Sequence, residues 1–303
     1  MSINKLQQAR DLELPTRQAM LERDASVQAF WDHNNNILSE AWSQWETSEQ
    51  EKLPLLSNAL LDDRLRDAVM QAWEDPSKES VVKDLWKEVA PNVYECQFFN
   101  PEKLTAFRDY LEQVWDAQIP LRPPYGIVLN RRGAMLDPRS QGYLAAPSFQ
   151  RFYQELLTTY MRPIARLLFP EIVGYDTQSF GFSIQYKPGT DTSIRPHTDA
   201  SAVTLNININ PQHEKFEGSA LNFYDSRMNL TSELSFKPGT AMIHRGNVPH
   251  AAQPITGGER SNIVLWLYGD YGRIPQRNTM APPTDARERW SVPSSAPDGF
   301  APF

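Results

Sequence analysis

Residues 193–210 read SIRPHTDASAVTLNININ, and the second half of this stretch decides the fold. From Val203 to Asn210, aliphatic residues alternate with Thr and Asn, which is the period of a strand with one apolar and one polar face. Asn forms strands poorly, so several on one face indicate hydrogen-bonding partners for their amides. The pattern predicts a strand whose aliphatic face packs on helices and whose polar face lines a cavity inside a barrel. A solvated surface strand is the alternative.

Short strand-like runs separated by turn residues fill the chain from about residue 177 to 270. They cover residues 179–186, 203–210, 220–224, 235–236, 240–244, 250–255 and 260–268, with breakers at 187–189, 237–239 and 257–258. Many short, closely spaced strands favour a sandwich or jelly roll. Residues 1–90 instead carry apolar residues at helical spacing, and further helices are predicted at 100–115 and 149–168.

The chain is predicted to have three parts. Residues 1–90 form a helical N-terminal segment packed on the core, residues 91–275 form the main domain, and residues 276–303 form a C-terminal extension. Five of the eight tryptophans lie in the first part, where core packing is a more common role than a ligand box. The extension is rich in Pro, Ser and Ala and is expected to be loosely packed.

Composition argues against some classes of binding partner and some cellular locations. The 30 basic and 37 acidic residues leave a formal net charge of −7, which argues against a nucleic-acid partner. No apolar run approaches the ~18–20 residues that cross a bilayer, and the first residues lack the apolar core of a secretory signal. The single cysteine, Cys96, excludes an intrachain disulfide. We therefore expect a cytoplasmic protein without a membrane partner; the sequence specifies no oligomeric state.

Two histidines and one aspartate have the pattern of a metal site. His197 and Asp199 form an H-x-D motif just before the quoted strand, and His250 begins a later one. Such a three-ligand face leaves half of an octahedron open, as non-heme Fe(II) oxygenases require for a bidentate co-substrate and dioxygen. Arg260, ten residues beyond His250, would hold a distal carboxylate of that co-substrate. H-x-D alone is a weak signal, whereas the full series is specific; His244 is interpreted as a core histidine rather than a ligand.

These residues resemble the Fe(II)/2-oxoglutarate-dependent dioxygenase superfamily, in particular its prolyl and lysyl hydroxylase branch. The resemblance is to the catalytic domain of procollagen lysyl hydroxylases. It covers about residues 177–270 and, more faintly, 125–130; its motifs are Ser193–Ser201, Val203–Asn206, Phe216–Gly218, Pro238–His244, His250 and Arg260. Animal lysyl hydroxylases carry glycosyltransferase-like domains where this chain has a helical segment, so the substrate is not carried over.

The resemblance implies an α+β fold with a double-stranded β-helix core (a cupin-like jelly roll) flanked by helices. It implies Fe(II), 2-oxoglutarate and O2 as the reacting groups, with ascorbate as a supporting one. His197, Asp199 and His250 would bind the iron. Arg260 would pair with the C5 carboxylate, and Tyr186, Asn206 and Asn208 would form hydrogen bonds to the co-substrate. Tyr186 as ordinary barrel core is the alternative for that residue.

The function expected from this set is oxidation, most simply hydroxylation, of an unactivated C–H bond with release of succinate and CO2. The substrate would be an amino-acid-like, peptidyl or specialised small molecule, and no catalytic residue is expected beyond the metal and co-substrate ligands. One rival is a non-catalytic jelly-roll sensor or scaffold. A second is a Zn or Mn cupin-like isomerase or hydrolase, which would need no counterpart of Arg260.

The irregular stretch 121–147 is the candidate substrate lid, because long loops in compact domains are commonly functional or disordered and this one is rich in Arg and Tyr. Arginines there would favour a substrate with an anionic group. A solvated loop face is the alternative for Arg131, Arg132 and Arg139. The residues expected to contact substrate are Arg122, Tyr125, Arg131, Arg139 and Arg245.

Overall fold

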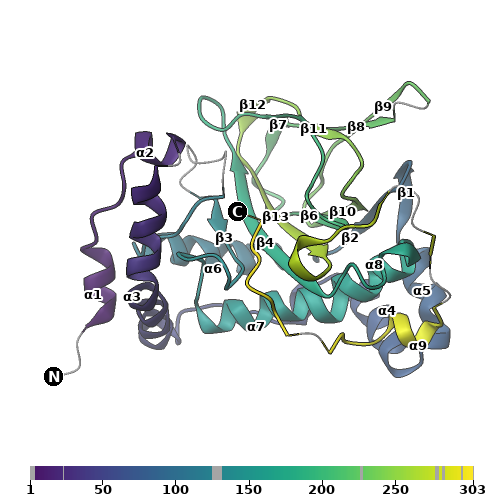
Figure 1. Cartoon of the computed structure of the whole chain (residues 1–303), viewed down its shortest axis with the longest axis horizontal. Coiled ribbons are helices and arrows are strands. Elements are labelled where there is room, and N and C mark those ends of the chain that lie inside the picture. The colour runs from purple at the N-terminus through teal and green to yellow at the C-terminus, as the bar shows by residue number, and fades with distance from the viewer. Residues whose placement is uncertain are drawn as a thin grey trace.

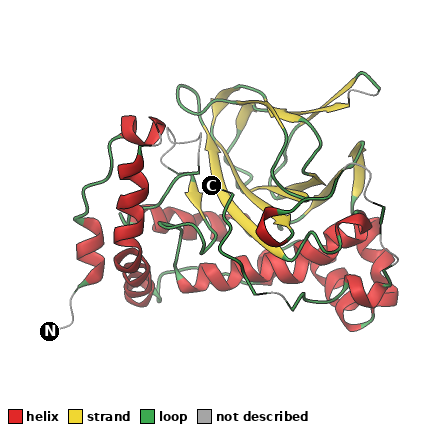
Figure 2. Ribbon diagram, viewed as in Figure 1, coloured by secondary structure: helices red, strands yellow, loops and turns green. Residues whose placement is uncertain are grey.

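Two antiparallel sheets face each other, and helices cover the outer side of the larger one (Figures 1 and 2). This architecture is that of a computed structural model, which describes residues 4–22, 24–124, 132–225, 228–276, 280–281, 284–294 and 296–302. Within these ranges, the helices are all too short or too polar to cross a membrane.

Seven strands form the larger sheet and four form the smaller one. The larger sheet has the order β1 (Lys87–Ala90), β2 (Val93–Gln97), β10 (Thr240–Arg245), β6 (Val203–Asn208), β13 (Arg260–Tyr268), β4 (Gln178–Tyr186) and β3 (Ala134–Met135). The smaller sheet has the order β5 (Ile194–His197), β11 (His250–Ala252), β8 (Leu221–Asp225) and β9 (Leu230–Leu234), and β7 (Phe216–Gly218) pairs with β12 (Ile255–Gly258). From β4 onward the chain passes back and forth between the two main sheets, which is the path of a double-stranded β-helix. The predicted α+β jelly roll is confirmed.

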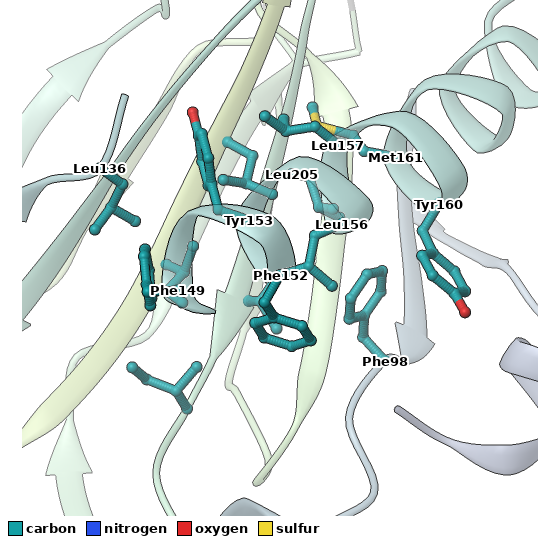
Figure 3. Close-up of a cluster of buried hydrophobic side chains, with 14 of the residues drawn as sticks. Phe98, Leu136, Phe149, Phe152, Tyr153, Leu156, Leu157, Tyr160, Met161 and Leu205 are labelled. Atoms are coloured by element: carbon teal, nitrogen blue, oxygen red, sulfur yellow. The ribbon is translucent and has the colours of Figure 1, made fainter. Parts of the chain in front are cut away.

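The β6 strand has one apolar face and one polar face, as its sequence predicts. Leu205 and Ile207 belong to the hydrophobic core between the larger sheet and the helices, and Figure 3 shows Leu205 among buried side chains of the helix region beneath it. Asn206 and Asn208 lie on the opposite face and are hydrogen-bonded to neighbours inside the barrel. The solvated-strand alternative is therefore wrong, because both faces of this central strand are buried.

Most of the helices come before β4 in the chain, and α9 follows the last strand. Their bounds are α1 Lys5–Arg10, α2 Arg17–Glu22, α3 Ala25–Glu49, α4 Asp63–Glu74, α5 Glu79–Asp84, α6 Leu104–Asp116, α7 Pro147–Glu155, α8 Arg162–Leu168 and α9 Ala286–Arg289, with short 3₁₀ turns at Asn58–Leu60, Pro76–Lys78, Pro170–Ile172 and Asp270–Gly272. The helix predicted from residue 100 begins only at Leu104, because Asn100 caps a preceding turn through the Glu102 N–H. Figure 1 shows α7 and α8 running beneath the strands.

The helix predicted at 149–168 is continuous but changes type, with a π-helical turn at Leu156–Met161 between α7 and α8. Pro163 lacks the N–H that would bond the Thr159 carbonyl one turn earlier. Trp73 supplies the missing donor from α4: its Nε1 lies 2.9 Å from that carbonyl. The Thr159 carbonyl therefore keeps a hydrogen-bond donor. The helix continues past the proline and packs against the barrel.

The terminal segments pack on the core. Trp31, Trp42 and Trp45 of α3 are buried in the cluster that also contains the helix-facing side of β13. The expectation of a loosely packed tail is wrong for Trp290, which is 5% exposed and donates its Nε1 to Glu79 at 3.0 Å. Composition alone could not reveal this distant acceptor. The division into parts at residues 90 and 275 stays a prediction.

Candidate metal and co-substrate site

The three residues of the predicted metal site converge at one end of the barrel. His197 ends β5, Asp199 lies in the loop that follows, and His250 begins β11 opposite His197 in the antiparallel register. The two His Nε2 atoms lie 3.6 and 3.8 Å from Asp199 carboxylate oxygens. One ligand atom from each residue falls within 4.8 Å of the others, so a single ion can contact all three.

Backbone carbonyls orient both histidines for metal binding. His197 Nδ1 lies 2.9 Å from the Arg195 carbonyl, and His250 Nδ1 lies 3.0 Å from the Val248 carbonyl. A carbonyl accepts only, so Nδ1 carries the proton and the Nε2 lone pair faces Asp199. Burial lowers the pKa of His250, with the attraction of Asp199 opposing this effect. The neutral imidazole, which is the metal-binding form, is therefore favoured.

Asp199 is held by the Thr204 hydroxyl, which the Ser201 hydroxyl contacts in turn, and by one backbone hydrogen bond. Thr204 Oγ1 donates to Asp199 Oδ2, and Ser201 Oγ lies 2.9 Å from Thr204 Oγ1. The Asp199 N–H donates to the Gly246 carbonyl at 2.9 Å. A side chain at Gly246 would place its Cβ 1.9 Å from the Ser201 carbonyl, so the two loops can approach this closely only at glycine.

A third imidazole lies beside the predicted ligands. His244 of β10 places Nε2 4.0 Å from Asp199 Oδ2, and its ring centroid lies 4.7 Å from that of His250. Its Nδ1 also contacts a backbone carbonyl, that of Arg245, at 2.9 Å. Burial, followed by repulsion from His250, lowers the pKa of His244 to about 4, so it is neutral at pH 7. His244 is thus a buried neighbour of the three predicted ligands, and its interpretation from the sequence as a core histidine stays a prediction.

Arg260 lies fully buried at the start of β13, directly opposite Tyr186 at the end of β4. Its guanidinium carbon stands 4.3 Å from the centroid of the Tyr186 ring, and Nη1 donates to the Ser219 carbonyl at 2.5 Å. In the part of the chain that the structure describes, Nε and Nη2 have no hydrogen-bond partner. These two N–H groups form one side of the guanidinium fork, which matches a carboxylate. The residues present therefore fit the distal carboxylate of 2-oxoglutarate.

Amides from β6 and β13 line the barrel between the metal ligands and Arg260. Asn262 Nδ2 donates to Asn206 Oδ1 at 2.6 Å, while Asn208 Nδ2 donates to Asn210 Oδ1 at 2.8 Å. The predicted contacts of Asn206, Asn208 and Tyr186 with the co-substrate stay predictions. Both asparagine side chains already have a hydrogen bond with Asn262. Asn262 was missed as a site residue, although its two-residue spacing from Arg260 places it on the same strand face.

Two of the arginines expected to contact substrate, Arg139 and Arg245, form ion pairs within the chain. Arg139 contacts both carboxylate oxygens of Asp137, at 2.8 and 3.0 Å. Arg245 pairs with Glu171, and Arg132 pairs with Glu112. Arg122 is buried and bonds through its backbone to Gly142 and Met135. Tyr125 and Arg131 lie outside the described residues, as does the rest of the faint 125–130 match. These contacts favour a structural role for the described lid arginines, and their contact with substrate stays a prediction.

A cavity of about 310 Å³ lies next to the metal ligands. Phe223 forms one wall and stacks on His250 with ring centroids 5.6 Å apart. Val248, whose carbonyl orients His250, forms another. Polar side chains on the walls include Asn92, Asp225, Arg245 and Asn247. The cavity therefore opens between the edges of the two sheets at the metal-bearing end of the barrel.

Comparison with known proteins agrees with this geometry. Residues 180–268 match the family described as the 2OG-Fe(II) oxygenase superfamily. This stretch of the chain is therefore similar to the superfamily over the strands of the barrel. The matched residues run from β4 to the end of β13 and so include Arg260 and the predicted metal ligands. The predicted resemblance to the superfamily and to its prolyl and lysyl hydroxylase branch is confirmed.

Several curated relatives carry the same domain description. The chain is 30% identical over 194 residues to a 2-oxoglutarate and iron-dependent oxygenase domain-containing protein of Arabidopsis thaliana, covering 59% of this chain and 46% of that protein. It is 35% identical over 120 residues to the multifunctional procollagen lysine hydroxylase and glycosyltransferase LH3 of Rattus norvegicus, covering 37% of this chain and 15% of that protein. A solved Pseudomonas putida prolyl-4-hydroxylase aligns over 66% of this chain and 98% of its own, with 15% identity and a TM-score of 0.44. The chain spans about half the length of the first curated relatives that it matches.

Proposed function

We propose that the protein is an Fe(II)- and 2-oxoglutarate-dependent oxygenase that hydroxylates an unactivated C–H bond. In the overall reaction, 2-oxoglutarate, O2 and the substrate C–H group become succinate, CO2 and the hydroxylated product. The observation that carries the proposal is the buried Arg260, with Nε and Nη2 unpaired among the described residues, in the same barrel as the metal triad. A cupin-like isomerase or hydrolase would have no use for this fork, and burying it without a ligand costs stability.

The protein's own residues supply binding, orientation and a dry site. His197, Asp199 and His250 would hold the iron, which when bound supplies the redox chemistry that couples O2 to decarboxylation of the co-substrate. Arg260 would hold the distal carboxylate and thereby set the reach of the co-substrate toward the metal. The apolar barrel side chains Phe182, Val264 and Trp266 exclude water from this space.

The cavity walled by Phe223 is the proposed site of the primary substrate. Its walls carry an acidic and a basic side chain, Asp225 and Arg245, which suits a polar substrate such as an amino-acid-like or peptidyl group. An Asp225→Asn variant is expected to raise KM for the primary substrate, while uncoupled succinate formation stays unchanged. The supporting role of ascorbate, the cytoplasmic location and the absence of nucleic-acid and membrane partners stay predictions.

The proposal is tested by oxygen-dependent conversion of 2-oxoglutarate to succinate with added Fe(II). The wild-type protein is expected to release succinate. His197→Ala is expected to lose this activity because it removes one of only three protein ligands to the metal. His213→Ala is the matched control, since His213 is an exposed histidine outside the site. Binding of 2-oxoglutarate without any succinate release, across a panel of candidate substrates, would instead identify a non-catalytic sensor.

A further inference from the structure

Ser219 lies beside Arg260 in the loop between β7 and β8. Its carbonyl accepts the hydrogen bond from Arg260 Nη1 at 2.5 Å, so its backbone touches the guanidinium. Its side chain is 1% exposed. Among the described residues, the Ser219 hydroxyl has no hydrogen-bond partner, as is true of Arg260 Nε and Nη2. Three unsatisfied buried donor groups therefore belong to two residues in direct contact.

The local backbone holds Ser219 in this place. Its N–H donates to the Pro254 carbonyl at 2.9 Å, and its φ of +58° lies in the left-handed region that favours glycine. The preceding Gly218 also has a positive φ, and a Cβ there would lie 2.5 Å from the Pro254 carbonyl. A serine in this conformation is strained, and the described residues offer its buried hydroxyl no hydrogen-bond partner to offset the loss of water. A ligand that accepts hydrogen bonds would satisfy it.

Other serines of the barrel do not share this condition. Ser183 Oγ accepts from the Ala134 N–H at 3.1 Å, and Ser261 Oγ lies 3.4 Å from Gln185 Nε2. Both lie on the opposite face of the larger sheet from the Arg260 side chain, since they alternate with barrel-facing residues on β4 and β13. Of these three serines, only Ser219, which touches Arg260, has a hydroxyl without a partner among the described residues.

We propose that Ser219 is a further co-substrate-binding residue whose hydroxyl donates a hydrogen bond to the distal carboxylate of 2-oxoglutarate. A carboxylate has about four acceptor positions, which exceeds the two donors of the Arg260 fork. Ser219 thus adds a donor that does not depend on the charge of the guanidinium. The inference rests on the proposed function, because it requires a dicarboxylate co-substrate in this barrel.

The experiment measures ligand affinity rather than turnover. Binding is followed by calorimetry without O2, with Mn(II) in place of Fe(II), for 2-oxoglutarate and for 2-oxobutyrate, which lacks the distal carboxylate. Ser219→Ala is expected to raise the Kd for 2-oxoglutarate about ten- to a hundred-fold, as for loss of one hydrogen bond to a charged group. The Kd for 2-oxobutyrate is expected to stay unchanged. Ser183→Ala, which removes a buried hydroxyl outside the pocket, is expected to change neither affinity.

Ser219→Gly separates ligand binding from backbone strain. Glycine removes the same hydroxyl but adopts positive φ freely, so its melting temperature without ligand is expected to equal or exceed that of the wild type. Its affinity for 2-oxoglutarate should fall as in Ser219→Ala. A Kd for 2-oxoglutarate within about twofold of wild type in both variants would overturn the role of Ser219. Equal weakening of both oxo acids would overturn it as well, whereas failure of the wild type to bind 2-oxoglutarate would overturn the proposed function itself.

Discussion

Arg260→Ala is expected to weaken 2-oxoglutarate binding more than any other single change outside the metal ligands. Two guanidinium N–H groups, Nε and Nη2, have no hydrogen-bond partner among the residues that the structure describes, while Nη1 donates to the Ser219 carbonyl. Truncating one partner of a buried charge pair costs about 2–5 kcal/mol. At about 1.4 kcal/mol per factor of ten, this corresponds to a roughly 30- to several-thousand-fold rise in Kd.

Removing the Arg260 charge is also expected to change the thermal stability of the ligand-free protein. This change is in the favourable direction, in contrast to the loss of ligand affinity. Burial lowers the pKa of Arg260 because it removes water from the charged form. The interaction with Tyr186 opposes this shift. Removing the charge relieves that desolvation, and Arg260→Met also keeps most of the buried volume. The melting temperature of Arg260→Met without ligand is therefore expected to equal or exceed that of wild type, while its stabilisation by 2-oxoglutarate disappears.

The assay compares thermal unfolding of wild type, Arg260→Met and Arg260→Lys over a range of 2-oxoglutarate concentrations, with Mn(II) present. Lysine keeps the charge but not the two-pronged geometry, so its stabilisation by ligand is expected to be intermediate. Arg287→Ala is the control, because Arg287 is exposed on α9. Wild-type stabilisation by 2-oxoglutarate in Arg260→Met would refute the assignment of the fork.

Three further changes test the surroundings of the site. Thr204→Val removes the hydroxyl that donates to Asp199 and is expected to weaken metal binding about 10- to 100-fold, measured by Co(II) titration; unchanged affinity would contradict this. Gly246→Ala forces a Cβ against the Ser201 carbonyl and is expected to cost about 1–3 kcal/mol of unfolding free energy, measured by urea denaturation; a neutral result would mean that the loops separate freely. Burial raises the pKa of the Cys96 thiol from 9.0 to about 12, so the stability that it contributes is full below pH 9.0 and is lost as pH rises toward 12. Cys96→Ala should flatten the fall of unfolding free energy in that window, and an unchanged alkaline slope would argue against the shift.

The β6 strand and its two faces follow from local sequence. The alternation from Val203 to Asn208 predicts β6 and both of its environments, because a strand places successive side chains on opposite faces whatever lies around it. The ends of helices were less predictable. Asn100 has the chemistry of a helix cap but closes a turn before α6, and only the packed structure selects between the two.

The pairing of charged side chains lies beyond the reach of local pattern. Arg139 and Arg245 look like substrate-binding residues in a loop-rich sequence, whereas the folded chain gives them Asp137 and Glu171 as partners. An arginine side chain pairs with a carboxylate that lies near it in the folded structure. For Arg245 that carboxylate belongs to a residue far away in the sequence. Spacing along the sequence therefore could not distinguish a structural ion pair from a lid.

The sequence by itself determined the ligand chemistry: two imidazoles, one carboxylate and an arginine on strands, because metal and carboxylate recognition depend on residue type and on short spacings such as H-x-D. Tertiary structure decided which residues share the pocket. The antiparallel register places Arg260 against Tyr186, and a loop 41 residues away brings the Ser219 carbonyl to its guanidinium. Such contacts depend on how two sheets close into a barrel, and closure is a property of the whole chain because each strand's register depends on its neighbours.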